Sequence, residues 1–148
     1  MAVDVISAKV QRMLTGAFND VRLTKDGGFS LPMGSTTVYV EIKEWTPDPE
    51  GNPRSLVYLW SPLGRGVTIS PELFEWAATE GRQKWFGGVN VQKNEDGKTA
   101  FVTYDHTLLG TTVDPDELTS AVNMVGWTAD DLDDVVTTKF GGKRWSDT

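Results

Sequence analysis

The stretch DPDELTSAVNMVGWTADDLDDVVTTKFGG, residues 114–142, carries the clearest structural signal in the chain. Asp114 and Pro115 are typical of a helix start, because an acidic side chain caps the first free N–H groups and proline suits the first helical position. Gly141 and Gly142 supply a stop. Apolar residues between these signals recur every three or four positions, which places them on one stripe of a helix: Leu118, Val122, Val125, Ala129, Leu132 and Val136. The segment therefore predicts a long helix whose stripe packs against another layer.

The sequence before this helix alternates between apolar and other residues at a period of two, which indicates β-strands. The clearest strand covers 36–45, where Val38, Val40 and Ile42 occupy alternate positions. Shorter strands are expected over 21–25, 29–31, 55–61, 89–91 and 99–105, with helices over 3–18 and 71–80.

These elements predict an α+β domain of two layers, in which helices cover one face of an antiparallel sheet. The expected order is α-β-β-β-α-β-β-α. We expect one domain over residues 1–142 and a short tail over 143–148, which frays unless Arg144 and Trp145 dock.

Composition excludes several classes of function. The chain has 148 residues, a net charge of −7, no cysteine and a single histidine, so thiol chemistry, disulfides and sites with two imidazoles are excluded within one chain. The acidic balance argues against binding to a nucleic-acid backbone. Residues 1–18 lack the pattern of a signal peptide, and no apolar stretch is long enough to span a membrane. We therefore expect a cytoplasmic protein without cofactors.

Three features resemble catalytic or ligand sites but lack the required spacing. His106 beside Asp105 has no nucleophile elbow to serve, and we interpret it as a histidine at the end of a strand. The acidic run 130–134 lacks the pattern of a calcium loop, so a solvated helix face is favoured. The glycines of 64–66 and 87–88 match no phosphate-binding loop and are interpreted as turn glycines. We expect no catalytic residue and no metal site.

The aromatic residues are the most informative feature for function. If the alternate valines of the strands face the helices, large aromatic side chains point to the other face of the sheet. That hypothetical patch consists of Tyr39, Trp45, Tyr58, Trp60 and Phe101. Large aromatic side chains on a helix-free face often mark a partner surface. Two alternatives remain open: a loop or a second subunit covers them, or a register shift of one residue reverses every side chain.

The helix expected over 71–80 is more apolar than a short surface helix requires. Leu73, Phe74 and Trp76 belong either to a subunit interface or to the core. Both interpretations are open at this point.

The closing segments resemble a known family. The segments 107–110, 116–118, 128–134 and 140–142 are similar to the end of YbjN-like peptide-binding chaperone domains, the TY-Chap group. The order of elements resembles the fold shared with type III secretion chaperones, and residues 35–40 and 73–76 also look similar. The resemblance implies a bacterial protein that binds unfolded or extended peptide segments, commonly as a homodimer. It implies no catalytic residues.

Three hypotheses follow. The first is a binding module that shields an extended segment of a partner protein. The second is a regulatory or structural homo-oligomer, similar to YbjN relatives, whose aromatic surface serves its own assembly and which has no client. The third and least favoured is an enzyme that relies on carboxylates. Size measurement and binding of apolar peptides distinguish the first two.

Overall fold

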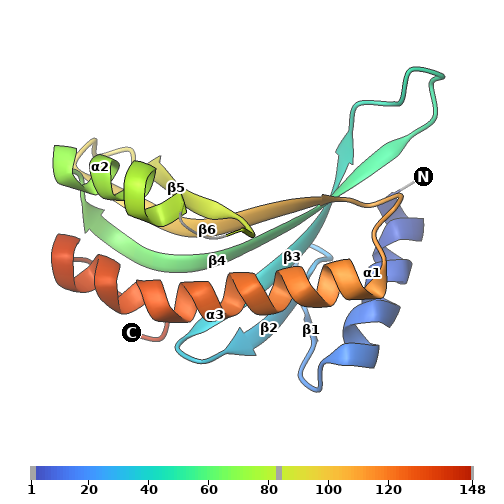
Figure 1. Ribbon diagram of the computed structural model, residues 1–148, viewed down its shortest axis with the longest axis horizontal. Coiled ribbons are helices and arrows are strands. Elements are labelled where there is room, and N and C mark those ends of the chain that lie inside the picture. Colours follow the sequence, from blue (N-terminus) through green and yellow to red (C-terminus); the bar gives the residue numbers. More distant parts are fainter. Residues whose placement is uncertain (1–2, 83–84, 148) are drawn as a thin grey trace.

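The computed structural model describes residues 3–82 and 85–147, and within them three helices cover a six-stranded antiparallel sheet (Figure 1). Neighbouring strands follow the order β1-β2-β3-β4-β6-β5. The elements, in chain order, are α1 (Val3–Ala17), β1 (Arg22–Leu23), β2 (Phe29–Met33), β3 (Thr36–Trp45), β4 (Arg54–Thr68), α2 (Pro71–Thr79), a 3₁₀ turn (Glu80–Arg82), β5 (Gly88–Lys93), β6 (Thr99–Leu109) and α3 (Pro115–Phe140).

The predicted α+β class with helices on one face is confirmed. The expected order has three strands before α2, whereas the structure has four, because the short strands expected over 21–25 and 29–31 both form, as β1 and β2, and pair with each other. Within the described ranges, no helix has the length and apolarity needed to cross a membrane.

The long helix α3 forms where the sequence places it. The Asp114 carboxylate accepts the backbone N–H of Glu117 at 2.8 Å, and Gly141 ends the helix with a φ of 79°. Figure 1 shows α3 running along the sheet, with α1 at one end of it. Gly126 permits close packing, because a Cβ there would overlap the Met33 sulfur and lie 3.0 Å from Val38.

The core lies between the helices and one face of the sheet. Alternate residues of β3 and β4 point into it, and the α1 stripe closes one end. Its buried members include Val38, Val40, Val57, Leu59, Ile6, Val10 and Leu14.

The short helix α2 is part of this core. Leu73 is fully buried, and the Trp76 ring packs 5.9 Å from that of Phe140 at the end of α3. Core packing therefore accounts for both residues, and they are not available to the subunit interface considered from the sequence. Phe74 is the one member of this predicted set that stays exposed, beneath the Lys93 ammonium at 5.8 Å.

Strand β4 is much longer than the sequence indicates. It continues past Ser61 to Thr68 through two register shifts against β6, on either side of Gly64. The interpretation of 64–66 as a turn is therefore wrong, because bulges allow a strand to bend and continue. The pairing of β4 with β3 ends at Trp60, so the far part of β4 extends beyond the edge of β3.

The acidic run is not a solvated helix face. Asp131 and Asp134 are exposed, but Asp133 is fully buried and Asp130 is half-buried. Ser35, in the turn between β2 and β3, donates its N–H to Asp130 at 2.7 Å, and its hydroxyl lies 2.7 Å from Asp130 and 2.5 Å from Asp133. We call Ser35, Asp130 and Asp133 the hairpin–helix lock. The acidic run itself gives no sign of its partner Ser35, which lies 95 residues before Asp130 in the chain.

Candidate functional site

The register of the sheet determines where the predicted aromatic residues lie. Residues that pair directly across antiparallel strands have side chains on the same face. Tyr39 pairs with Trp60, which pairs with Asp105 on β6, while Val40 pairs with Leu59 on the core side. Counting in steps of two from these pairs places all five expected residues on the helix-free face: Tyr39, Trp45, Tyr58, Trp60 and Phe101.

Three of these rings contact one another at the junction of β3, β4 and β6. Tyr39 stacks on Trp60 with centroids 4.4 Å apart and planes at 17°, and Phe101 meets Trp60 edge-on at 6.1 Å. A fourth ring, Trp145 from the segment after α3, lies 6.1 Å from both Tyr39 and Phe101. We call Tyr39, Trp60, Phe101 and Trp145 the aromatic cluster. All four are half-buried, so part of each ring still faces solvent.

Trp45 lies apart from the cluster. It is six positions from Tyr39 along β3, a span of roughly 20 Å at the rise of a strand. Its ring is 43% exposed and stacks beneath the Arg54 guanidinium at 4.2 Å. The predicted patch is therefore divided into a compact cluster and a separate tryptophan at the base of the β3–β4 loop, which projects from the molecule in Figure 1.

Tyr58 lies between these two parts and is held by a polar network. Its hydroxyl donates to Asp105 at 2.6 Å, and the other oxygen of that carboxylate accepts the Thr103 hydroxyl at 2.5 Å. Burial and the bond to Asp105 raise the pKa of Tyr58 far above its usual value, so the phenol stays protonated. The Lys43 ammonium lies 5.1 Å from the ring centre. These contacts hold the Tyr58 side chain in one position on the helix-free face.

A groove of about 500 Å³ adjoins the aromatic cluster. Trp60, Phe101 and Trp145 line its apolar side, Arg65 stands at one end, and residues 92–95 of β5 and the following turn form its other wall. Rings beside charged and polar side chains suit an apolar side chain with a polar backbone. The groove leaves one side of the cluster open.

His106 is not at a strand end, because β6 continues to Leu109. Its register partner Leu59 is in the core, so the imidazole lies on the helix side, with the Phe86 ring 5.4 Å away. Burial lowers the pKa of His106 and favours the neutral form. Asp105 points to the opposite face, so the neighbours in sequence form no catalytic pair.

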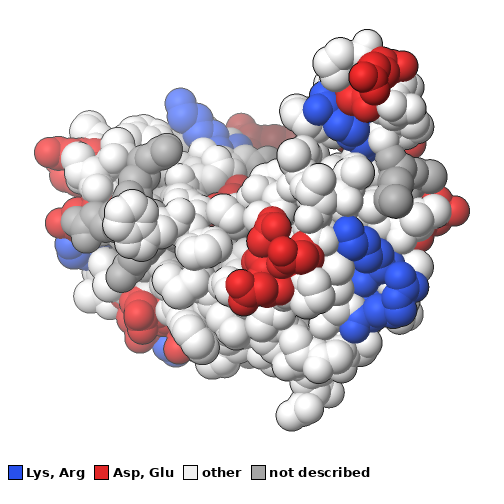
Figure 2. Space-filling view, turned by 45° about the vertical axis from the view of Figure 1, so that its right-hand side comes forward, with Lys and Arg blue, Asp and Glu red and all other residues white. Residues whose placement is uncertain are grey.

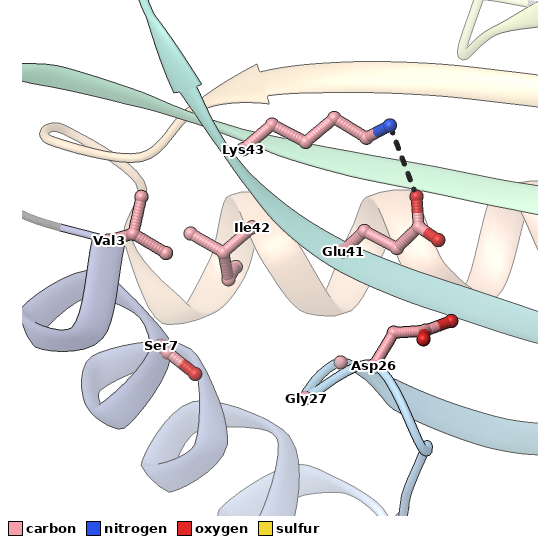
Figure 3. A pocket seen from close by; sticks show the side chains of 8 residues that line it. Val3, Ser7, Asp26, Gly27, Glu41, Ile42 and Lys43 are labelled. Atoms are coloured by element: carbon pink, nitrogen blue, oxygen red, sulfur yellow. Dashed lines mark ion pairs between the residues drawn. The ribbon is translucent and has the colours of Figure 1, made fainter.

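A second hollow, of about 220 Å³, lies between α1, the β1–β2 turn and β3 (Figure 3). Val3 and Ser7 of α1 and Ile42 of β3 line its apolar part. Two of its charged residues pair, since the Lys43 ammonium reaches the Glu41 carboxylate at 3.4 Å, as the dashed line shows, and Asp26 in the β1–β2 turn adds a further carboxylate. Nothing in this arrangement aims a reactive group into the hollow.

The helix layer also exposes apolar side chains. Trp127 on α3 is 58% exposed and Val5 on α1 is 52% exposed. Figure 2 shows acidic and basic side chains gathered in separate groups, with wide uncharged surface between them. Isolated exposed apolar residues of this kind are common on protein surfaces and do not by themselves mark a site.

Comparison with protein families decides the assignment. The model of the family described as T3SS (YopN, CesT) and YbjN peptide-binding chaperone 1, TY-Chap1, matches residues 3–148. The chain belongs to this family. The resemblance seen in the closing segments is therefore confirmed, and the TY-Chap1 match extends through the segment that carries Trp145. Comparison with curated proteins gave no match.

Sequence reasoning did not place two residues of the site in this TY-Chap1 domain. The sequence leaves docking of Trp145 open, as the alternative to fraying after the stop at Gly141 and Gly142, but it does not indicate where the ring lies. Asp105 was considered only with His106, although its position in β6 places it opposite Trp60. Strand phase alone identifies Asp105 once the pairing is known. Trp145 has no such signal, because its segment is irregular.

Proposed function

We propose that this TY-Chap1 domain binds an extended, apolar segment of a partner protein on the helix-free face of its sheet. The observation that carries the proposal is the aromatic cluster. Tyr39, Trp60 and Phe101 form a half-exposed platform on a face that no helix covers. The family's description as a peptide-binding chaperone supports the same role.

The proposed mechanism is burial of a side chain combined with pairing of backbone. An apolar or aromatic side chain of the partner packs against the rings, where edge-to-face contacts add to the gain from buried area. The partner's main chain can pair with an exposed sheet edge, as in other cases of strand addition. The outer edge of β5 has no strand partner within the described residues. No step in this mechanism is chemical, and we propose a non-enzymatic protein.

Charge supports one class of partner over others. The net charge of −7 repels nucleic acid and attracts basic segments, which raises the rate of encounter. It also keeps a protein with exposed rings soluble. We propose that the domain acts in the bacterial cytoplasm, where newly made or partly unfolded chains present such segments.

A homodimer is part of this proposal, and a homo-oligomer without a client is the second candidate. The rings of Phe74 on α2 and Trp85 before β5 are exposed outside the cluster and favour such self-association. If the second candidate holds, the domain is a dimer at micromolar concentration and binds no peptide.

The test is binding of an array of overlapping peptides to the native chain, with the size of the protein measured by light scattering. Trp60→Ala removes the centre of the cluster, and Trp127→Ala is the matched control on the helix side. We expect peptides rich in aromatic residues to bind the native chain and the control, and to lose at least tenfold in affinity for Trp60→Ala. Equal binding by both variants would contradict the proposal, provided circular dichroism shows both folded.

A further inference from the structure

The segment after α3 crosses from the helix side of the sheet to the open face. Gly142 lies against β4, where a Cβ would be 2.5 Å from the Arg65 carbonyl oxygen and 3.0 Å from the Val67 nitrogen. Lys143 and Arg65 then exchange two backbone hydrogen bonds, each of 2.9 Å. The segment thus occupies the edge of β4 that extends beyond β3. This backbone pair is the kind of contact that an added strand makes, here supplied by a segment of the same chain.

Two residues after this backbone pair, Trp145 reaches the open face. Its indole N–H donates to the Tyr39 hydroxyl at 3.1 Å, and its ring meets Tyr39 edge-on at 86°. The same ring lies 6.1 Å from Phe101, and the Arg65 guanidinium covers it at 5.7 Å. Trp145 therefore has every contact that an aromatic anchor of a bound segment would have.

The contacts that hold the segment on either side of this ring are polar. Arg144, which is half-buried, pairs with the exposed Asp134 of α3 at 2.8 Å, and Arg65 donates to the Asp147 carbonyl. A further pair, Arg144 with Asp147 at 3.3 Å, lies within the segment. Ion pairs at such positions contribute little to stability and are screened by salt. A short segment outside the helices and strands that is held in this way can open without unfolding the domain.

We propose that residues 143–147 are an intramolecular occupant of the partner site, which a partner segment displaces. This inference rests on the proposed function and adds its regulation and the chemistry of its partner. The partner segment is extended and carries an aromatic residue two positions after the residue that pairs with Arg65. A basic residue directly before the aromatic one replaces Arg144 opposite Asp134.

A tethered occupant competes at an effective concentration set by its short linker, in the millimolar range. A free segment must overcome this competition, so its apparent affinity is reduced by the fraction of molecules with an open site. Removal of the Trp145 ring abolishes this intramolecular competition and leaves the surface of Tyr39 and Phe101 that the ring contacts free to bind. The affinity for a segment added in trans should then rise at least tenfold.

The probe is the free octapeptide GGKRWSDT, which has the sequence of residues 141–148, titrated into ¹⁵N-labelled full-length protein. We expect Trp145→Ala to bind it at least tenfold more tightly than the native chain and the Trp127→Ala control do, with shifts at Tyr39, Trp60 and Phe101. A peptide with alanine in place of its tryptophan should not bind. Equal affinity for all three proteins, shifts elsewhere, or no binding at all would overturn the proposal.

A second measurement does not depend on the variant. In the native chain the indole N–H signal of Trp145 reports its bond to Tyr39, and an array peptide that displaces the segment should move this signal toward that of a free indole. A peptide that shifts Tyr39 and Phe101 but leaves the Trp145 indole unchanged would overturn the displacement while supporting the proposed function. If no array peptide shifts the cluster, the proposed function fails, whereas binding of the octapeptide still tests the occupant.

Discussion

The hairpin–helix lock predicts that one buried aspartate is protonated in the native state. The Ser35 hydroxyl has a single proton but lies within hydrogen-bonding distance of two carboxylates, Asp130 at 2.7 Å and Asp133 at 2.5 Å. The hydroxyl can donate to only one of them, and both contacts are satisfied if the other carboxyl carries a proton and donates to the hydroxyl oxygen. Burial raises the pKa of Asp133, whereas the N–H and hydroxyl of Ser35 lower the pKa of Asp130. We therefore expect Asp133 to hold the proton and Asp130 to be the acceptor.

The surroundings of Asp133 agree with this assignment. Its other oxygen, Oδ1, is buried without a hydrogen-bond partner among the described residues, which is far less costly for a neutral acid than for a carboxylate. The charge of Asp134 also raises the pKa of Asp133, whereas a bond donated by the Ser35 hydroxyl, a backbone bond from Asp134 and the charge of Arg144 would each lower it. Desolvation is the largest of these effects.

The perturbation is Asp133→Asn, whose amide can still donate to Ser35 but cannot ionise. Because the native pKa of Asp133 is raised, its favourable contribution is complete below the unfolded value of about 3.9 and is lost as pH rises through the native pKa. The loss is at most about 1.4 kcal/mol per pH unit. We expect the free energy of unfolding of the native chain to fall relative to that of Asp133→Asn as pH rises from about 4 through the native pKa of Asp133, and to level off above it.

The assay is urea unfolding followed by tryptophan fluorescence across this pH range. Asp130→Ala is the contrasting variant, since it removes the acceptor of two bonds from Ser35, and it should cost about 2–3 kcal/mol near pH 7. The pKa of Asp130 in the native chain is lowered, so the cost of removing this carboxyl should shrink as pH falls through the native pKa of Asp130. Parallel pH profiles for the native chain and Asp133→Asn would refute the assignment of the proton.

Three further predictions concern stability. Gly126→Ala should destabilise the fold by about 1–3 kcal/mol, because the new Cβ would overlap Met33. Gly16→Ala in the exposed part of α1 should stabilise it by about 0.5–1 kcal/mol, because a Cβ there meets no atom and alanine favours the helix; thermal unfolding measures both changes. Asp114→Ala removes the cap of α3 and should lower the free energy of unfolding in urea by about 1 kcal/mol. An equal loss of stability in Asp116→Ala would argue against the cap. Tyr58→Phe leaves Asp105 with one hydroxyl donor and should cost about 1.5–3 kcal/mol, and a stability equal to that of the native chain would show that the network contributes nothing.

Much of the fold could be predicted because local and tertiary preferences agree. In α3 the cap, the apolar stripe and the glycine stop indicate the same helix, and the structure buries five members of the predicted stripe. The strand phase likewise places Tyr39 and Trp60 on the helix-free face, since the period of two leaves only two choices.

The errors arise where a distant partner overrides the local pattern. Gly64 and Gly66 are typical of turns, but pairing with β6 carries β4 through them as a bulged strand. Asp133 belongs to an acidic run that suits a solvated face, yet the β2–β3 turn covers it. Trp145 contacts Tyr39, 106 positions earlier in the chain, and no local pattern encodes such a contact.

The most direct test of a partner site on the helix-free face is an isotope-filtered NOE measurement on the complex with the tightest-binding array peptide. It detects protons of the peptide that lie close to assigned ring protons of the protein. The account predicts contacts from the peptide's aromatic anchor to Tyr39, Trp60 and Phe101. Contacts confined to the helix layer, such as those to Trp127, would contradict it.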